Sequence, residues 1–250
     1  MKPYEIKIIE TCKSTNDLLI EYALQGAKEG QSIISKYQTK GRGTKNNIWL
    51  SESGNIFLST LLRPKSNKKY WSQLSLLAGL SVFETLSEIG VKRNDMKIKW
   101  PNDILINFKK VCGILIESID NFVVVGFGLN LKTHPKVIEG EFKATSLSKY
   151  YGLKTRKIDI ISEIILKRFF KNYKKWDNKS LKKFLFDINF NLAYLGQNIL
   201  FTKKNDIIMG KLLGVNHLGL LDISANEKKY EILNSEGLFY LISGEQDVSS

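Results

Sequence analysis

Residues 96–131 read MKIKWPNDILINFKKVCGILIESIDNFVVVGFGLNL, and they determine the fold class. Four short apolar segments lie in this stretch, at residues 96–100, 103–106, 111–118 and 122–131, and only short polar turns separate them. Strands joined by such turns pair antiparallel, because a parallel pair needs a crossover of a dozen residues or more. The stretch therefore predicts an antiparallel meander within a mixed α+β fold, rather than a doubly wound parallel sheet.

The sequence before and after this meander predicts further strands and helices of the same domain. Apolar and β-branched clusters between turn signals indicate strands, and apolar residues at helical spacing indicate helices. The polar run from Ser14 to Asp17 is typical of a helix start, and Gly26 of a helix end. We expect helices to cover one face of a mainly antiparallel sheet. The expected strands are residues 4–9, 32–37 and 55–62, and the expected helices are residues 15–25, 70–89, 158–176 and 180–194.

Beyond Gly196 the sequence changes to short strands with frequent turn signals. About fifty residues of this kind predict a small barrel of five strands, of the SH3-like type. We expect two domains, a larger one at residues 1–195 and a barrel domain at residues 196–250. The five expected strands are residues 198–202, 207–215, 219–223, 229–233 and 237–242.

Composition excludes several classes of protein. The chain has 250 residues, with 43% hydrophobic and 25% charged, as in an ordinary globular protein. Two cysteines and two histidines at no ligand-like spacing predict neither a disulfide framework nor a resident metal. No apolar run approaches the length of a membrane span, and the N-terminus alternates like a strand, so we expect a cytoplasmic protein.

The net charge of +13 raises the question of nucleic-acid binding. Residues 154–183 carry eleven Lys and Arg against three acidic residues, which accounts for +8 of that charge. Apolar residues from Ile161 to Trp176 recur at helical spacing, and most of the lysines fall between them. We therefore expect a solvated, lysine-rich helix face rather than a nucleic-acid surface.

A glycine-rich loop at residues 41–47, Gly-Arg-Gly-Thr-Lys-Asn-Asn, is a candidate anion site. Backbone N–H groups and fixed cations together suit a phosphate or a carboxylate. The loop lacks the third glycine of a dinucleotide fingerprint and the Gly-Lys-Ser/Thr end of a Walker loop. Taken alone, it fits a flexible surface hairpin equally well.

Three other motifs leave two interpretations each. Lys99 ends a strand, where it either meets an anionic ligand or lies on the solvated face with Trp100 in the core; alternation alone favours the solvated face. Glycines at 113, 126 and 128 indicate either bulges or the close approach of a backbone or a flat ligand. Ser14-Thr15-Asn16 suits a helix cap that also faces a polar ligand.

Taken together, these motifs closely resemble those of the biotin protein ligases. The resemblance covers about residues 8–150 and extends more weakly into the C-terminal barrel. Seven short motifs occur in the order of that family. They are Ser14-Thr15-Asn16, Gln38 with Gly41-Arg42-Gly43, Trp49, residues 99–103 (Lys-Trp-Pro-Asn-Asp), Gly113-Ile114-Leu115, Gly126-x-Gly128-x-Asn130 and Thr145-Ser146-Leu147.

The resemblance implies a two-step ligase that uses biotin and MgATP. Biotinyl-5′-AMP forms first, and biotin then passes to a lysine of the biotin carboxyl carrier domain of a carboxylase. The residues implied as catalytic are Lys99 and Arg42. Those implied to bind biotin are Ser14, Thr15, Asn16, Gln38, Arg42, Gly43, Thr44, Lys99, Gly113 and Leu115. Those implied to bind ATP or the adenylate are Gly41, Lys45, Trp49, Asn102, Asp103, Asn130, Thr145 and Ser146.

The chain departs from the family pattern in its loop and at its N-terminus. Relatives usually carry a second loop arginine where this chain has Thr44, and we expect Lys45 to supply the missing charge. Only thirteen residues precede Ser14, which leaves no room for the winged helix-turn-helix of many bacterial relatives, so we expect no specific DNA binding. Pairing into a homodimer stays open.

Other functions remain as alternatives. A lipoate ligase is the nearest one, although the Lys99 motif and the barrel favour biotin. A basic nucleic-acid-binding protein and a non-catalytic protein that merely holds biotin are the others.

Overall fold

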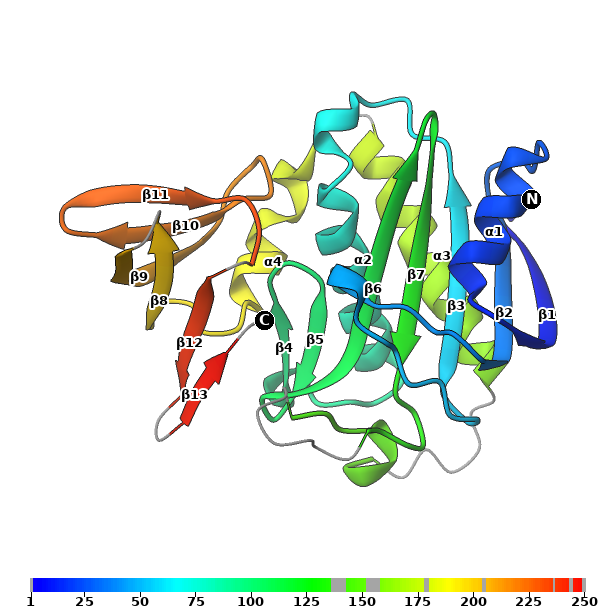
Figure 1. The fold of residues 1–250 in the computed structure, drawn as a ribbon, viewed down its shortest axis with the longest axis horizontal. Helices are drawn as coiled ribbons and strands as arrows, with labels where there is room; N and C mark the ends of the chain where they lie inside the picture. The colour runs from blue at the N-terminus through cyan, green and yellow to red at the C-terminus, as the bar shows by residue number, and fades with distance from the viewer. Residues whose placement is uncertain are drawn as a thin grey trace.

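The structure is a computed structural model that describes residues 2–135, 143–151, 158–177, 180–203, 206–235, 237–242 and 245–248. Two sheets and the helices packed on them make up this part of the chain (Figure 1). None of the described helices is both long and apolar enough to span a bilayer. The strands of the larger sheet are β1 (Glu5–Cys12), β2 (Gln31–Gln38), β3 (Ile56–Leu62), β4 (Met96–Lys99), β5 (Asp103–Ile106), β6 (Lys109–Ile119) and β7 (Phe122–Leu129).

The seven-stranded sheet has the order β1-β2-β3-β7-β6-β5-β4. Strands β4 to β7 form the predicted antiparallel meander, and β3 pairs antiparallel with both β2 and β7. Only β1 and β2 run parallel, because helix α1 (Thr15–Leu24) provides the crossover between them. The predicted mixed α+β class, with a mainly antiparallel sheet, is confirmed.

One face of this sheet packs on α2 (Gln73–Glu88) and α3 (Ile158–Asp177), which lie behind it in Figure 1. The main hydrophobic core fills this space, where Leu58, Ile114 and Phe127 of the sheet meet the two helices. Nearly the whole of α2 is buried, since it lies between the sheet and α3. Along each strand these side chains alternate with others that lie on the opposite face of the sheet, and residues on that face can therefore form a site.

The expectation that helices cover only one face is wrong. Helix α1 packs on the opposite face, where Leu19 and Ala23 form a second, smaller core with Ile33, Leu61 and Val124 (Figure 1). Strand β3 is buried at all seven positions because helices cover both of its faces. A strand in which polar and apolar residues do not alternate does not reveal which face each helix covers.

Two expected helices are shorter than the sequence indicates. Residues 68–70 form a separate 3₁₀ turn before α2 begins at Gln73. Residues 181–184 are also a 3₁₀ turn, and α4 (Leu185–Phe190) is a helix of six residues. After α4 the chain pairs with the edge strand β4. The Ile98 N–H donates to Asn191 O, and the Ala193 N–H donates to Ile98 O. This bridge covers the open edge of β4.

Helix α3 has the predicted lysine-rich outer face. Its apolar residues, such as Phe169 and Trp176, are buried in the core, whereas Lys167, Lys171 and Lys174 are exposed. The solvated-face interpretation is confirmed for this helix. Lys154, Arg156, Lys157 and Lys179 of the same basic segment lie outside the described residues.

The second sheet contains six strands in the order β11-β10-β9-β8-β12-β13, all paired antiparallel. One of them, β13, was not expected. Trp100 Nε1 donates to Gly219 O at 2.9 Å, and Gln73 Nε2 to His217 O at 3.1 Å, so this sheet docks on the first part of the chain. Closure into an SH3-like barrel stays a prediction. The strands are β8 (Asn198–Lys203), β9 (Asp206–Val215), β10 (Leu221–Ala225), β11 (Lys228–Ile232), β12 (Leu238–Ile242) and β13 (Glu245–Val248).

Candidate active site

A cavity opens on the face of the larger sheet that α2 and α3 leave uncovered. The start of α1, the loop at residues 41–49 and the middle of strands β6 and β7 enclose it. Eleven of the predicted site residues line it, which brings together motifs that lie far apart in the sequence. The lining residues are Ser14, Thr15, Asn16, Gln38, Arg42, Gly43, Thr44, Trp49, Phe57, Asn102, Lys110, Gly113, Ile114, Leu115, Gly126, Phe127 and Gly128.

Strand register explains why these residues meet. Asp103 pairs with both Lys99 and Gly113, and Gly113 pairs with Gly128, which pairs in turn with Phe57. Directly paired residues point their side chains to the same face. The neighbouring residues of the same strands, such as Ile98 and Ile114, face the core instead. A row of residues on one face of the sheet therefore runs from Lys99 into the cavity.

The strand glycines allow other side chains to approach the sheet closely. A Cβ atom on Gly128 would lie 2.5 Å from Trp49 Cε2, and one on Gly113 would lie 2.8 Å from Trp49 Cζ3. A Cβ atom on Gly126 would lie 2.4 Å from Asn16 Oδ1. All three glycines are in regular pairing, so of the two interpretations left open by the sequence, close approach is the correct one.

Replacing Gly128 by alanine is expected to displace Trp49 from the sheet and to cost about 1–3 kcal/mol of stability, the usual range for overpacking. Chemical denaturation should report the lost stability, and tryptophan fluorescence should report the altered environment of Trp49. Gly79→Ala on α2 is the matched control, because a Cβ there would meet only ordinary contacts at 3.7 Å or more. Unchanged stability and fluorescence in Gly128→Ala would show that Trp49 does not depend on this glycine.

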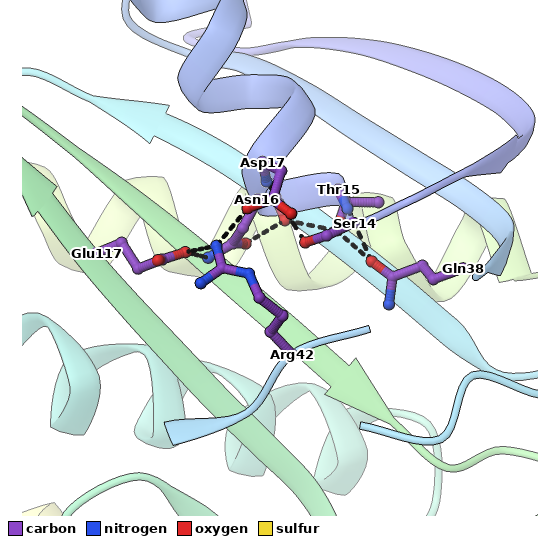
Figure 2. A network of polar contacts seen from close by, with 8 residues as sticks. Ser14, Thr15, Asn16, Asp17, Gln38, Arg42 and Glu117 are labelled. Carbon is purple, nitrogen blue, oxygen red and sulfur yellow. Dashed lines mark hydrogen bonds and ion pairs between the residues drawn. The ribbon is translucent and has the colours of Figure 1, made fainter. Parts of the chain in front are cut away.

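At one end of the cavity, buried polar groups hold one another in fixed orientations (Figure 2). Gln38 Oε1 accepts from the Thr15 N–H at 2.7 Å and from Thr15 Oγ1 at 3.1 Å, and Gln38 Nε2 donates to Ser51 Oγ at 2.9 Å. Ser14 caps α1 through a contact of 3.4 Å from the Asp17 N–H. Because the Gln38 amide is oriented on both sides, this end presents a preorganised polar surface.

Arg42 crosses from the loop to two carboxylates on other elements (Figure 2). Its Nη2 donates to Glu117 Oε2 at 2.7 Å and also to Asp17 Oδ1. The same Glu117 oxygen accepts from Asn16 Nδ2 at 2.8 Å. Burial lowers the pKa of Arg42, but the hydrogen bond to Glu117 and the charges of Glu117 and Asp17 outweigh this, so the net pKa is raised. The loop is thus tied across the cavity by a charged contact.

Lys99 and Trp100 are both buried, with exposed fractions of 5% and 3%. The solvated-face interpretation of Lys99 is therefore wrong, although its placement of Trp100 in the core is confirmed. Register places the Lys99 side chain on the cavity face of the sheet, beside Asp103. Neither Lys99 nor Asp103 lines the cavity itself. Asp103 forms an ion pair with Lys110 at 2.8 Å.

Five other predicted residues do not line the cavity either. Gly41 leaves space for Ser51 and Trp49, and Lys45 is exposed on the loop. Asn130 Nδ2 donates to Thr145 O at 3.1 Å, and the Thr145 N–H donates to Lys110 O at 2.8 Å. Ser146 is within 3.2 Å of His134 Nδ1. Asn130 and Thr145 therefore support the backbone of Lys110 rather than the cavity directly.

The sequence did not identify Lys110, Glu117 and Asp17 as site residues. Lys110 was placed in a turn, and Glu117 appeared as an ordinary strand residue. A weak signal was present, since Glu117 lies two positions after Leu115 and therefore on the same face of β6. The fold and the cavity together define a concave, polar site between a sheet and a loop, of the kind that suits a small polar molecule.

Comparison with known proteins identifies the family. The model of the Biotin/lipoate A/B protein ligase family matches residues 8–131. The bifunctional ligase/repressor BirA of Bacillus subtilis is 33% identical over 237 residues, which are 91% of this chain and 71% of that protein. The biotin–[acetyl-CoA-carboxylase] ligase of Mycobacterium tuberculosis is 35% identical over 147 residues, 57% of this chain and 54% of that protein.

A solved structure agrees with these relatives. The biotin protein ligase from Aquifex aeolicus in complex with biotin and ATP has a TM-score of 0.81 and 33% identity, and the match covers 94% of this chain and 97% of that one. The chain belongs to the biotin/lipoate A/B protein ligase family. The resemblance to the biotin protein ligases, seen in the sequence motifs, is confirmed.

Proposed function

We propose that this protein is an ATP-dependent biotin protein ligase. It activates biotin to biotinyl-5′-AMP and transfers biotin to a lysine of a biotin carboxyl carrier domain. The proposal is supported by the names of two relatives, a biotin–[acetyl-CoA-carboxylase] ligase and a biotin protein ligase in complex with biotin and ATP. The observation that carries the proposal is the convergence of the Ser14, Gln38 and Arg42 motifs on one cavity, with the row from Lys99 leading into it.

The cavity suits both the ureido ring and the carboxylate of biotin. Buried hydroxyls and an oriented amide at Ser14, Thr15 and Gln38 match a ureido ring, which both donates and accepts hydrogen bonds. The carboxylate then points along the sheet toward Lys99. A few fixed polar groups in a concave site are typical of small-molecule recognition.

Adenylation brings the biotin carboxylate to the α-phosphate of ATP, and two anions repel each other. A fixed cation at that point lowers the barrier because it offsets the charge of the transition state. The Lys99 ammonium supplies this charge, and Mg²⁺ arrives with ATP. Trp49 adds a donor, since its buried Nε1 has no hydrogen-bond acceptor among the described residues.

Transfer to a carrier domain tests this function directly. Purified protein, biotin and MgATP are incubated with a biotin carboxyl carrier domain, and the carrier is examined by mass spectrometry. A single biotinylated lysine, formed only when both biotin and ATP are present, is the expected result. An unmodified carrier with bound biotin would indicate a protein that only holds biotin, and labelling by lipoate in place of biotin would indicate a lipoate ligase.

Lys45 is proposed to help the loop to hold the adenylate, because Thr44 stands where relatives carry a second arginine. Lys45 adopts φ 55°, a backbone conformation that is unfavourable for lysine and is found where a site fixes it. Lys45→Ala should release the adenylate about two- to fivefold faster, the effect of one exposed charge. Rapid filtration measures the retained adenylate, and Lys40→Ala is the control. Retention equal to that of the wild type rules out this role.

The proposal also covers the domains of the protein, its partners and its location. The C-terminal sheet is proposed to be an SH3-like barrel domain at residues 196–250, after a catalytic domain at residues 1–195. The same proposal includes binding of the carrier domain, pairing into a homodimer and action in the cytoplasm, where ATP is available.

A further inference from the structure

A buried serine on β3 lies beneath the polar side chains at the start of α1. Ser59 has no exposed surface and does not line the cavity. On the same face of β3, Phe57 belongs to the cavity wall and Leu61 to the small core under α1. An apolar residue at position 59 would continue that core, whereas a buried hydroxyl lowers stability unless hydrogen bonds satisfy it.

The hydroxyl of Ser59 contacts the first two residues of α1. Its Oγ donates to Thr15 Oγ1 at 2.7 Å and to Asn16 Oδ1 at 2.5 Å. Strand register supplies the space, because Ser59 pairs with Gly126, and a Cβ on that glycine would lie 2.4 Å from Asn16 Oδ1. The serine and the glycine together allow both side chains of α1 to reach the sheet.

The directions of the hydrogen bonds determine what these side chains offer to a ligand. The Thr15 hydroxyl gives its one proton to Gln38 Oε1, so toward a ligand its oxygen can only accept. Asn16 Nδ2 donates to Glu117 Oε2, which leaves Asn16 Oδ1 turned toward Ser59 (Figure 2). A ligand that contacts Thr15 Oγ1 must therefore supply a donor, such as an N–H group.

We propose that Ser59 is a positioning residue for biotin, which acts through Thr15 and Asn16 and does not touch the ligand. The inference rests on the proposed function, in which a ureido ring with N–H donors binds at this end of the cavity. Because the Ser59 proton reaches both acceptors, it fixes the Thr15 oxygen and keeps the Asn16 amide from turning over. Without it, two buried acceptors lose their shared donor.

Biotin binding to Ser59→Ala tests this role. Biotin is titrated by calorimetry, and carrier biotinylation is followed by steady-state kinetics at saturating ATP. The Kd of biotin should rise about tenfold, the effect of leaving a buried acceptor without its donor. KM for biotin should rise in parallel, whereas kcat should change less than about twofold, because the groups at the reacting carboxylate are untouched.

Ser32→Ala is the matched control, since Ser32 is equally buried on the neighbouring strand β2. Its Oγ lies 2.8 Å from another threonine hydroxyl, that of Thr60, and neither of these residues lines the cavity. Chemical denaturation should show a similar loss of stability in Ser32→Ala and Ser59→Ala. The control should keep the wild-type Kd and KM for biotin.

A wild-type Kd for biotin in Ser59→Ala would overturn this role and leave the proposed function intact. Equal losses of biotin affinity in Ser59→Ala and Ser32→Ala would also overturn it, since the effect would then come from stability alone. So would a fall in kcat with unchanged KM, which would place Ser59 in the chemical step. A wild-type protein that binds no biotin would contradict the proposed function, and the role of Ser59 with it.

Discussion

Replacing Lys99 by methionine is expected to slow formation of biotinyl-5′-AMP by about 10²–10³-fold, the usual cost of removing one preorganised group that stabilises transition-state charge. Methionine keeps the length of the side chain and removes only the ammonium. Since Lys99 is 5% exposed, water does not replace the lost charge. Single-turnover measurements of adenylate formation would show the loss in the chemical step.

The control for Lys99 is Lys97→Met. Lys97 lies on the same face of β4, two residues before Lys99, and pairs with Leu105, away from the cavity. Adenylate formation at the wild-type rate is expected for this variant. If Lys99→Met retained the wild-type rate, or if both variants lost it equally, Lys99 would not supply the charge at the reacting atoms.

Replacing Arg42 by methionine is expected to lower kcat/KM for biotin about 10- to 30-fold. The substitution leaves Asp17 and Glu117 without their shared cation, and losing one partner of a hydrogen-bonded charge pair costs about 2–5 kcal/mol when the pair is buried. The three side chains are 22–41% exposed, so solvent screening reduces this to about 1.4–2 kcal/mol. Steady-state kinetics at saturating ATP would measure it.

Two further variants show whether the effect passes through Glu117. Arg42→Met and Glu117→Gln should be less than additive when combined, because both remove the same contact. Lys36→Met breaks a highly exposed ion pair with Glu10 and should leave kcat/KM unchanged. Strict additivity of the first two would mean that Glu117 does not position Arg42.

The sequence predicted the parts of the fold that depend on local patterns. Short turns indicated the meander, and every expected strand of the larger sheet is present within a few residues. Strand β13 was missed because its residues, Glu245–Val248, are mostly polar and do not alternate. The place of α1 on the opposite face was missed because the only polar residues of β3, Ser59 and Thr60, are adjacent and therefore lie on opposite faces, so neither face of the strand is marked as polar.

The motifs predicted most of the cavity wall but not its charge pairs. Arg42 meets Glu117 across 75 positions of sequence, and no local pattern predicts such a contact. Lys99 was predicted to lie on a solvated face because a prediction from alternation assumes that one face of a strand is exposed to solvent. In β4 both Ile98 and Lys99 are buried, so the assumption fails there.

Exchange of labelled pyrophosphate into ATP tests most directly whether biotin is activated in this cavity. The wild-type protein should catalyse exchange that depends on biotin and not on lipoate, and Lys99→Met should lose it while Lys97→Met keeps it. Exchange that depends on lipoate alone, or full biotin-dependent exchange in Lys99→Met, would contradict the account.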